Sequence, residues 1–154
     1  MIRSVTHATF HIDRVFDCTP ARLWRAFSDP AQKAAWACHE TWTMKEMTFT
    51  VGGREISGGS DPGGPYWAFD GTYLDIVPEQ RFVVAYTMRR DEVPVSASII
   101  TWLVAPHARG CVLRFTDQGA YLDGHADPVE REAGSGVGLD NLEQLLRAER
   151  DAAA

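Results

Sequence analysis

The segment from Asp127 to about Arg150 constrains the fold most strongly, because it reads as one long helix. Asp127 is a predicted N-cap, Pro128 suits the first helical position, and Glu130 completes a capping-box pattern. An apolar stripe at helical spacing follows, made of Leu139, Leu142, Leu145 and Leu146. A helix of about 23 residues is roughly 35 Å long, which is enough to cross a small domain.

Three glycines interrupt this helical pattern at alternate positions, namely Gly134, Gly136 and Gly138. Each glycine costs about 1 kcal/mol relative to alanine in a helix interior, so roughly 3 kcal/mol of helix propensity is missing here. Either the helix kinks at this point or the missing side chains leave room beneath it. We expect Gly134 or Gly138 to face the sheet and to leave a cavity there.

Composition indicates a single globular domain with an ordinary core. The chain has 154 residues, of which 45% are apolar and 23% charged, and its net charge is −6. Because no cluster of Lys and Arg occurs, we expect neither nucleic acid nor a membrane surface as a partner. The N-terminus lacks an apolar signal core, and no apolar run approaches the roughly 18 residues of a membrane span, which favours a cytoplasmic protein.

The cysteines predict reduced thiols. Cys18, Cys38 and Cys111 are odd in number and show no CxxC spacing. They follow the first predicted strand, end the second predicted helix and start the last predicted strand. We therefore expect no intramolecular disulfide.

Alternating apolar residues and turn signals predict seven strands and two short helices before the long one. The strands are expected at residues 6–17, 42–51, 54–57, 66–77, 81–90, 95–104 and 111–120. Thr19-Pro20 and Asp29-Pro30 open the short helices, and Gly52-Gly53 is a hairpin turn. Residues 58–65, rich in Gly and Pro, are expected to be a loop. Because the connections from the second strand onward are too short for crossovers, the sheet must be antiparallel and the fold class α+β.

Many expected inward-facing residues are bulky and mixed in polarity, which suits the wall of a ligand cavity as well as an ordinary core. Together with the helix glycines they favour a cavity that opens toward the 58–65 loop and the two short helices. The predicted cavity residues are Trp36, Trp42, Phe69, Tyr73, Tyr86, Met88, Trp102, Phe115, Tyr121, Gly134, Gly138 and Leu142.

Several short motifs resemble one protein family. They are RVFD at 14–17, LWRAF at 23–27, GGR at 52–54, GTYLDIVPEQRF at 71–82, QGAYLDG at 118–124, REAG at 131–134 and LDNL at 139–142. The chain is similar in these motifs to bacterial relatives of the activator of heat-shock-protein-90 ATPase. These belong to the SRPBCC superfamily, with the START lipid carriers, the birch-pollen-allergen fold and the polyketide cyclases. The resemblance covers roughly residues 8–148. It implies a helix-grip fold, in which a seven-stranded curved antiparallel sheet holds the C-terminal helix.

Motifs for catalysis or metal binding are weak. Cys38-His39-Glu40 brings three ligand types together, but adjacent residues rarely converge on one ion, so we expect no metal and no cofactor. No motif links any of the 5 histidines to a nucleophile. Acid–base catalysis in the cavity would need a charged inward side chain, for which Arg54, Asp70 and Arg114 are candidates, with Arg14 and Glu46 also considered. The alternative for each of these residues is a structural one, in which the side chain faces solvent or pairs with a charge on the neighbouring strand.

The sequence thus predicts a protein that binds a small apolar or amphipathic ligand in an internal cavity, with no assignable reaction. One alternative is a polyketide-cyclase-like enzyme that uses a cavity acid or base. A second alternative, implied by the resemblance, is a co-chaperone-like regulator of a heat-shock ATPase. The sequence leaves open whether the chain forms a homodimer.

Overall fold

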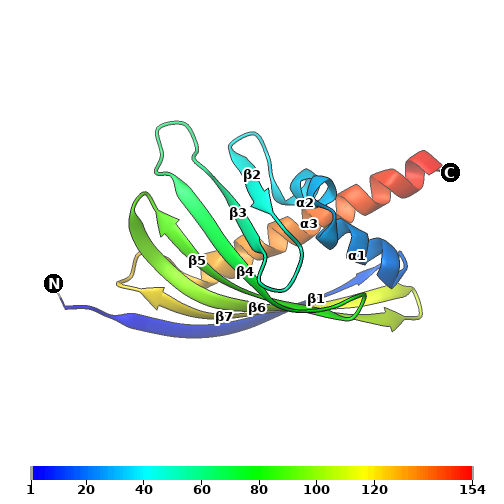
Figure 1. Ribbon diagram of the computed structural model, residues 1–154, viewed down its shortest axis with the longest axis horizontal. Helices are drawn as coiled ribbons and strands as arrows, with labels where there is room; N and C mark the ends of the chain where they lie inside the picture. Colours follow the sequence, from blue (N-terminus) through cyan, green and yellow to red (C-terminus); the bar gives the residue numbers. More distant parts are fainter. Residues whose placement is uncertain (1, 154) are drawn as a thin grey trace.

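A computed structural model describes residues 2–153 and shows a curved sheet with helices on its concave side (Figure 1). In chain order the elements are β1 (Val5–Phe16), α1 (Pro20–Ser28), α2 (Pro30–Ala37), β2 (Trp42–Met47), β3 (Arg54–Gly59), β4 (Trp67–Val77), β5 (Arg81–Arg90), β6 (Val93–His107), β7 (Gly110–Leu122) and α3 (Pro128–Ala153).

The 7 strands form one sheet in the order β1-β7-β6-β5-β4-β3-β2. Every neighbouring pair is antiparallel. After α1 and α2, each strand from β2 to β6 pairs with the next along the chain, and β1 forms the other edge by pairing with β7. The predicted α+β class and helix-grip architecture are therefore confirmed, with α3 running along the hollow of the sheet (Figure 1).

The predicted helix starts are confirmed in their capping geometry. Thr19 Oγ1 accepts a hydrogen bond from the Arg22 backbone N–H at 3.1 Å, and Asp29 Oδ1 accepts one from Ala31 at 2.9 Å. Asp127 Oδ1 accepts one from Val129 at 2.8 Å. Each cap satisfies a backbone donor that the first helical turn cannot pair internally. α3 continues through the glycines without a break in its helical assignment.

The region after β2 differs from the prediction. β2 ends at Met47 instead of continuing to residue 51, and the expected loop at 58–65 begins later, because β3 includes Gly58 and Gly59. A Cβ on Gly59 would lie 1.5 Å from the Thr41 carbonyl oxygen. These glycines therefore act as strand residues where another part of the backbone approaches closely, and not as chain breakers.

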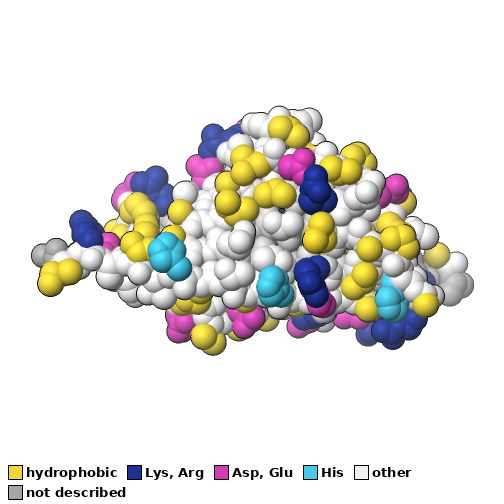
Figure 2. Space-filling model, turned by 90° about the horizontal axis from the view of Figure 1, so that it is seen from below, with side chains coloured by type: hydrophobic (Ala, Val, Ile, Leu, Met, Phe, Trp, Pro, Cys, Tyr) yellow, Lys and Arg dark blue, Asp and Glu magenta, His cyan; other side chains and the backbone are white. Residues whose placement is uncertain are grey.

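The core fills the closed end of the sheet under α1 and α2. Leu23 and Phe27 of α1 are fully buried, and Phe82 and Trp102 of the sheet stack with ring centroids 5.2 Å apart. Burying one such side chain contributes roughly 1.5–3 kcal/mol, so these contacts fix the short helices on the sheet. The outer face differs, since its hydrophobic side chains lie scattered among charged and histidine side chains (Figure 2).

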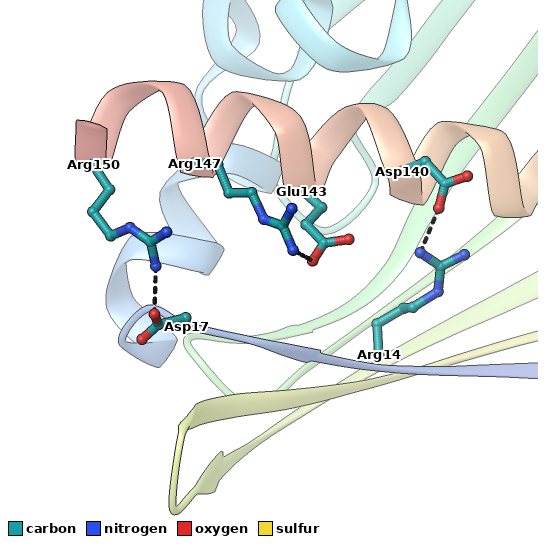
Figure 3. A network of polar contacts seen from close by, with 6 residues as sticks. All are labelled: Arg14, Asp17, Asp140, Glu143, Arg147 and Arg150. Atoms are coloured by element: carbon teal, nitrogen blue, oxygen red, sulfur yellow. Dashed lines mark hydrogen bonds and ion pairs between the residues drawn. The ribbon is translucent and has the colours of Figure 1, made fainter. Parts of the chain in front are cut away.

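Ion pairs attach the middle and the C-terminal end of α3 to the first strand and the residue that follows it. Arg150 pairs with Asp17, and Arg14 Nη1 of β1 lies 2.6 Å from Asp140 Oδ1 (Figure 3). Leu139 and Leu142 are the residues of α3 that are buried in the core. The first turns of the helix, before Leu139, therefore bury no apolar side chain in the core.

Candidate functional site

A cavity of about 660 Å³ lies between the concave face of the sheet and the N-terminal half of α3. Its wall is mainly aromatic and aliphatic, with contributions from α2, from β2 to β7 and from the loop before α3. The apolar wall residues are Trp36, Ala37, Trp42, Trp67, Phe69, Phe82, Val84, Met88, Ile100, Trp102, Phe115, Ala126 and Leu139. Such a volume is typical of sites for small organic molecules.

The helix glycines contribute directly to this space. Gly134 and Gly138 line the cavity, and a Cβ built on either would meet no heavy atom within 4 Å. Gly136 faces the other way, where a Cβ would lie 3.8 Å from Arg14 Nη2. Of the two explanations for the glycines, the structure shows room beneath an unbroken helix.

A buried polar cluster occupies the α2 side of the cavity. Lys33 Nζ lies 3.4 Å from Glu55 Oε1, and the Tyr73 hydroxyl donates a hydrogen bond to the same oxygen at 2.5 Å. Burial, with the Glu55 charge nearby, raises the pKa of Tyr73 well above its usual range. Lys33, Glu55 and Ser57 all line the cavity, and none of the three was predicted from the sequence.

A second polar cluster lies under the first turns of α3. Arg131 donates hydrogen bonds to the Tyr86 hydroxyl and to Ser96 Oγ, both at 2.8 Å, and Tyr86 donates to Asp117 Oδ2 at 2.6 Å. The Arg131 guanidinium also lies 5.2 Å from the ring centroid of Tyr121. Asp117 is 1% exposed, and burial raises the pKa of its carboxyl. Arg131 therefore joins the helix to the sheet through a chain of buried polar groups.

Most of the predicted cavity residues meet around this space. Trp36, Trp42, Phe69, Tyr86, Met88, Trp102, Phe115, Gly134 and Gly138 all line it. Tyr73, Tyr121 and Leu142 do not, because their side chains are packed into the interior of the protein at 1%, 2% and 0% exposure. The cavity was also predicted to open toward the 58–65 loop and both short helices. Of these segments only α2 contributes to its lining.

The acid–base candidates from the sequence lie elsewhere. Arg54 and Asp70 form an ion pair with both side chains nearly half exposed. Arg114 Nε donates to Asp13 Oδ1 at 2.9 Å on the outer face. None of Arg54, Asp70 and Arg114 lines this cavity, and each is paired with an oppositely charged side chain of a neighbouring strand.

The cysteines are free thiols, as predicted, although Cys18 and Cys111 lie closer together than their places in the sequence suggest. Cys18 and Cys111 share a side-chain hydrogen bond, which lowers the pKa of the Cys18 thiol. Their proximity follows from the pairing of Phe16 with Cys111 in the β1–β7 register.

Two kinds of site are absent from residues 2–153, a metal-binding cluster and a membrane-spanning helix. Within this range no group of three or more His, Cys, Asp or Glu side chains is placed to hold a metal ion. No helix in the same range has the length and apolar character needed to cross a membrane.

Comparison with known proteins places these features in a family. Residues 17–147 match the family model described as activator of Hsp90 ATPase homolog 1-like protein. A solved structure from Rhizobium leguminosarum is similar at 40% identity and a TM-score of 0.90, covering 96% of this chain and 99% of that one. A protein from Rhizobium loti is 37% identical with a TM-score of 0.86, covering 92% of this chain and 98% of that one.

A third structure, from Chromobacterium violaceum, is 30% identical with a TM-score of 0.76, covering 89% of this chain and 95% of that one. A search of curated proteins found no match. The family model spans most of the chain, and the structural likeness extends over nearly its whole length. The chain therefore belongs to the activator of Hsp90 ATPase homolog 1-like family, within the SRPBCC superfamily.

Proposed function

We propose that this protein binds a small, largely apolar molecule in the cavity between the sheet and α3. The observation that carries the proposal is the aromatic wall beneath Gly134 and Gly138, because at these two positions the helix adds no side chain to the cavity. Apolar cavities of this kind bind apolar guests when the surrounding backbone is too rigid to collapse. The continuous sheet and the ion pairs along α3 supply that rigidity.

The direct test is the uptake of an uncharged apolar fluorescent probe, N-phenyl-1-naphthylamine, by the wild type and by Gly138→Leu. The leucine would extend into open space within the cavity, so it should weaken probe binding while leaving the melting temperature unchanged or higher. Binding that is equal in both proteins, or absent from the wild type, would contradict the proposal.

Val137→Leu is the matched control. It places a leucine one residue away on the same helix, at a position that is 58% exposed and does not line the cavity. Probe binding should be unchanged in this variant. A loss of stability of a few kcal/mol in Gly138→Leu alone would show instead that the space is too small for a guest.

Acid–base catalysis on the bound molecule is a second candidate function. The observation in its favour is the Lys33–Glu55 pair, which places a buried amine and a buried carboxylate on the cavity wall. The test is to identify compounds that co-purify with the protein by mass spectrometry and to follow their conversion with wild type and Glu55→Gln. Conversion by the wild type that is lost in Glu55→Gln would support an enzyme, whereas unchanged compounds would support a carrier.

A further inference from the structure

Lys33 and Glu55 form the most deeply buried ion pair among residues 2–153. Their side chains are 8% and 9% exposed, whereas both partners of every other pair in this range are at least 14% exposed. A buried ion pair adds little stability, because desolvation of the two charges offsets their attraction. The position of this pair on the wall of a ligand-sized cavity therefore invites a functional explanation.

The hydrogen-bonding capacity of this pair is only partly used. Glu55 Oε1 accepts a hydrogen bond from the Tyr73 hydroxyl and forms the ion pair with the Lys33 ammonium. Glu55 Oε2 accepts no hydrogen bond from residues 2–153. The Lys33 ammonium has three N–H donors and Glu55 as its single oxygen contact in that range, at 3.4 Å. An acceptor position on Glu55 and donors on Lys33 therefore remain for a guest.

The other neighbours of Lys33 are aromatic faces. Its Nζ lies 4.9 Å from the ring centroid of Trp36 and 5.2 Å from that of Trp102. Ring faces attract a cation, but an oxygen acceptor forms a stronger, directional hydrogen bond with an ammonium. The same rings are flat apolar surfaces on which an aromatic guest can pack.

The charges of Lys33 and Glu55 favour a neutral polar group on the guest over an ionised one. Lys33 and Glu55 neutralise each other, so an added carboxylate would bring an unbalanced charge into a poorly hydrated site. A neutral hydroxyl adds no charge, and it can accept from Lys33 while it donates to Glu55 Oε2. At the other end of the cavity, Arg131 already hydrogen-bonds to Tyr86 and Ser96.

We propose that Lys33 and Glu55 form a subsite for the hydroxyl group of a neutral aromatic ligand, that is, a phenol. The inference rests on the proposed function, because it names the polar group carried by the apolar molecule that the cavity binds. The phenol ring lies against Trp36 and Trp102, and its oxygen lies between the ammonium and the free carboxylate oxygen.

Three probes of similar shape test this inference at pH 7, namely naphthalene, 2-naphthol and 2-naphthoate. They carry no polar group, a neutral hydroxyl and a carboxylate, respectively, and tryptophan fluorescence reports their binding. The naphthol should bind about tenfold more tightly than naphthalene, as expected for one hydrogen bond to a charged group. It should also bind more tightly than the naphthoate.

The double variant Lys33→Met/Glu55→Gln removes both charges together, which avoids leaving one of them unpaired in the interior. Its naphthol affinity should fall to about that of naphthalene, while its naphthalene affinity stays unchanged. Arg54→Met is the control, since Arg54 is next to Glu55 on β3 but pairs with Asp70 away from the cavity. It should alter the binding of none of the probes.

The outcomes separate this inference from the proposed function. If none of the probes binds the wild type, both proposals are overturned. If naphthalene and naphthol bind equally well, the cavity is an apolar site and the hydroxyl subsite is overturned. Tighter binding of the naphthoate, or full naphthol affinity in the folded double variant, would also overturn the subsite.

Discussion

Arg14 of β1 reaches up to α3, where its Nη1 lies 2.6 Å from Asp140 Oδ1 and its Nη2 lies 3.4 Å from the Gly136 carbonyl oxygen. In the sequence this arginine interrupts the apolar face of its strand. In the structure it joins the edge of the sheet to α3, and its side chain points toward Asp140 (Figure 3). The charged residue therefore ties α3 to the sheet at the level of the cavity.

Arg14→Met should lower the free energy of unfolding by about 0.5 kcal/mol, because partly exposed ion pairs contribute little. Denaturant titration measures this change. Arg114→Met is the control, since its pairing with Asp13 lies on the outer face and does not involve α3. Loss of probe binding in Arg14→Met alone would show that the pair also holds the cavity in shape. A larger effect of Arg114→Met would contradict the assignment.

Gly134→Ala should stabilise the protein by up to about 1 kcal/mol, because it restores helix propensity. Its added methyl group meets no heavy atom within 4 Å. Thermal unfolding of the ligand-free protein measures the gain. A loss of stability would show that the helix does not run as described over the cavity.

Gly59→Ala should have the opposite effect. The new Cβ would lie 1.5 Å from the Thr41 carbonyl oxygen, so β3 or the chain near Thr41 must move. Overpacking of this kind typically costs about 1–3 kcal/mol, which denaturant titration can measure. Stability equal to that of the wild type would mean that the backbone approach at Gly59 is not required.

The fold was predictable because its signals are local. The caps Thr19, Asp29 and Asp127 each act within three residues, and they determine where the helices begin. Alternation along the longer strands determined the face on which the bulky residues lie. The space beneath Gly134 was predictable for the same reason, since a missing side chain is visible in the sequence.

The polar part of the cavity was not predictable, because it depends on residues distant in sequence. Lys33 and Glu55 meet only when α2 packs over β3, and each alone reads as a solvated charge. Glu55 is also buried while the neighbouring Ile56 is less so, which reverses the usual pattern of a half-buried strand. The shared helix face of Lys33 and Trp36, at a spacing of i, i+3, was the available signal.

The thiols should differ in reactivity. The hydrogen bond with Cys111 lowers the pKa of Cys18, whereas burial raises the pKa of Cys38. Because the thiolate is the nucleophile, iodoacetamide should modify Cys18 before Cys38 in the native protein. Mass spectrometry after timed quenching measures the order. Cys111→Ala should slow the reaction of Cys18, and faster modification of Cys38 in the wild type would contradict this prediction.

Asp117 should make stability depend on pH. Burial raises the pKa of its carboxyl above the ordinary 3.8, so the folded chain binds this proton more tightly than the unfolded chain does. The contribution of Asp117 to the free energy of unfolding is therefore highest at low pH. It falls as the pH rises from about 3.8 through the raised pKa, and is then constant. Asp117→Asn keeps an acceptor for the Tyr86 hydroxyl but removes the titration.

Relative to the wild type, Asp117→Asn should therefore gain stability as the pH rises through this window. Denaturant titrations at several pH values measure the difference. Asp13→Asn is a control with the opposite sign, because its hydrogen bond with Arg114 lowers the pKa of Asp13. The stability that Asp13 contributes is present above its ordinary pKa and is lost as the pH falls through the lowered value, so the Asn variant should lose stability relative to the wild type with rising pH. If the free energies of unfolding of Asp117→Asn and the wild type changed in parallel with pH, the prediction would be contradicted. The carboxylate of Asp117 would then be as stable in the folded protein as in water.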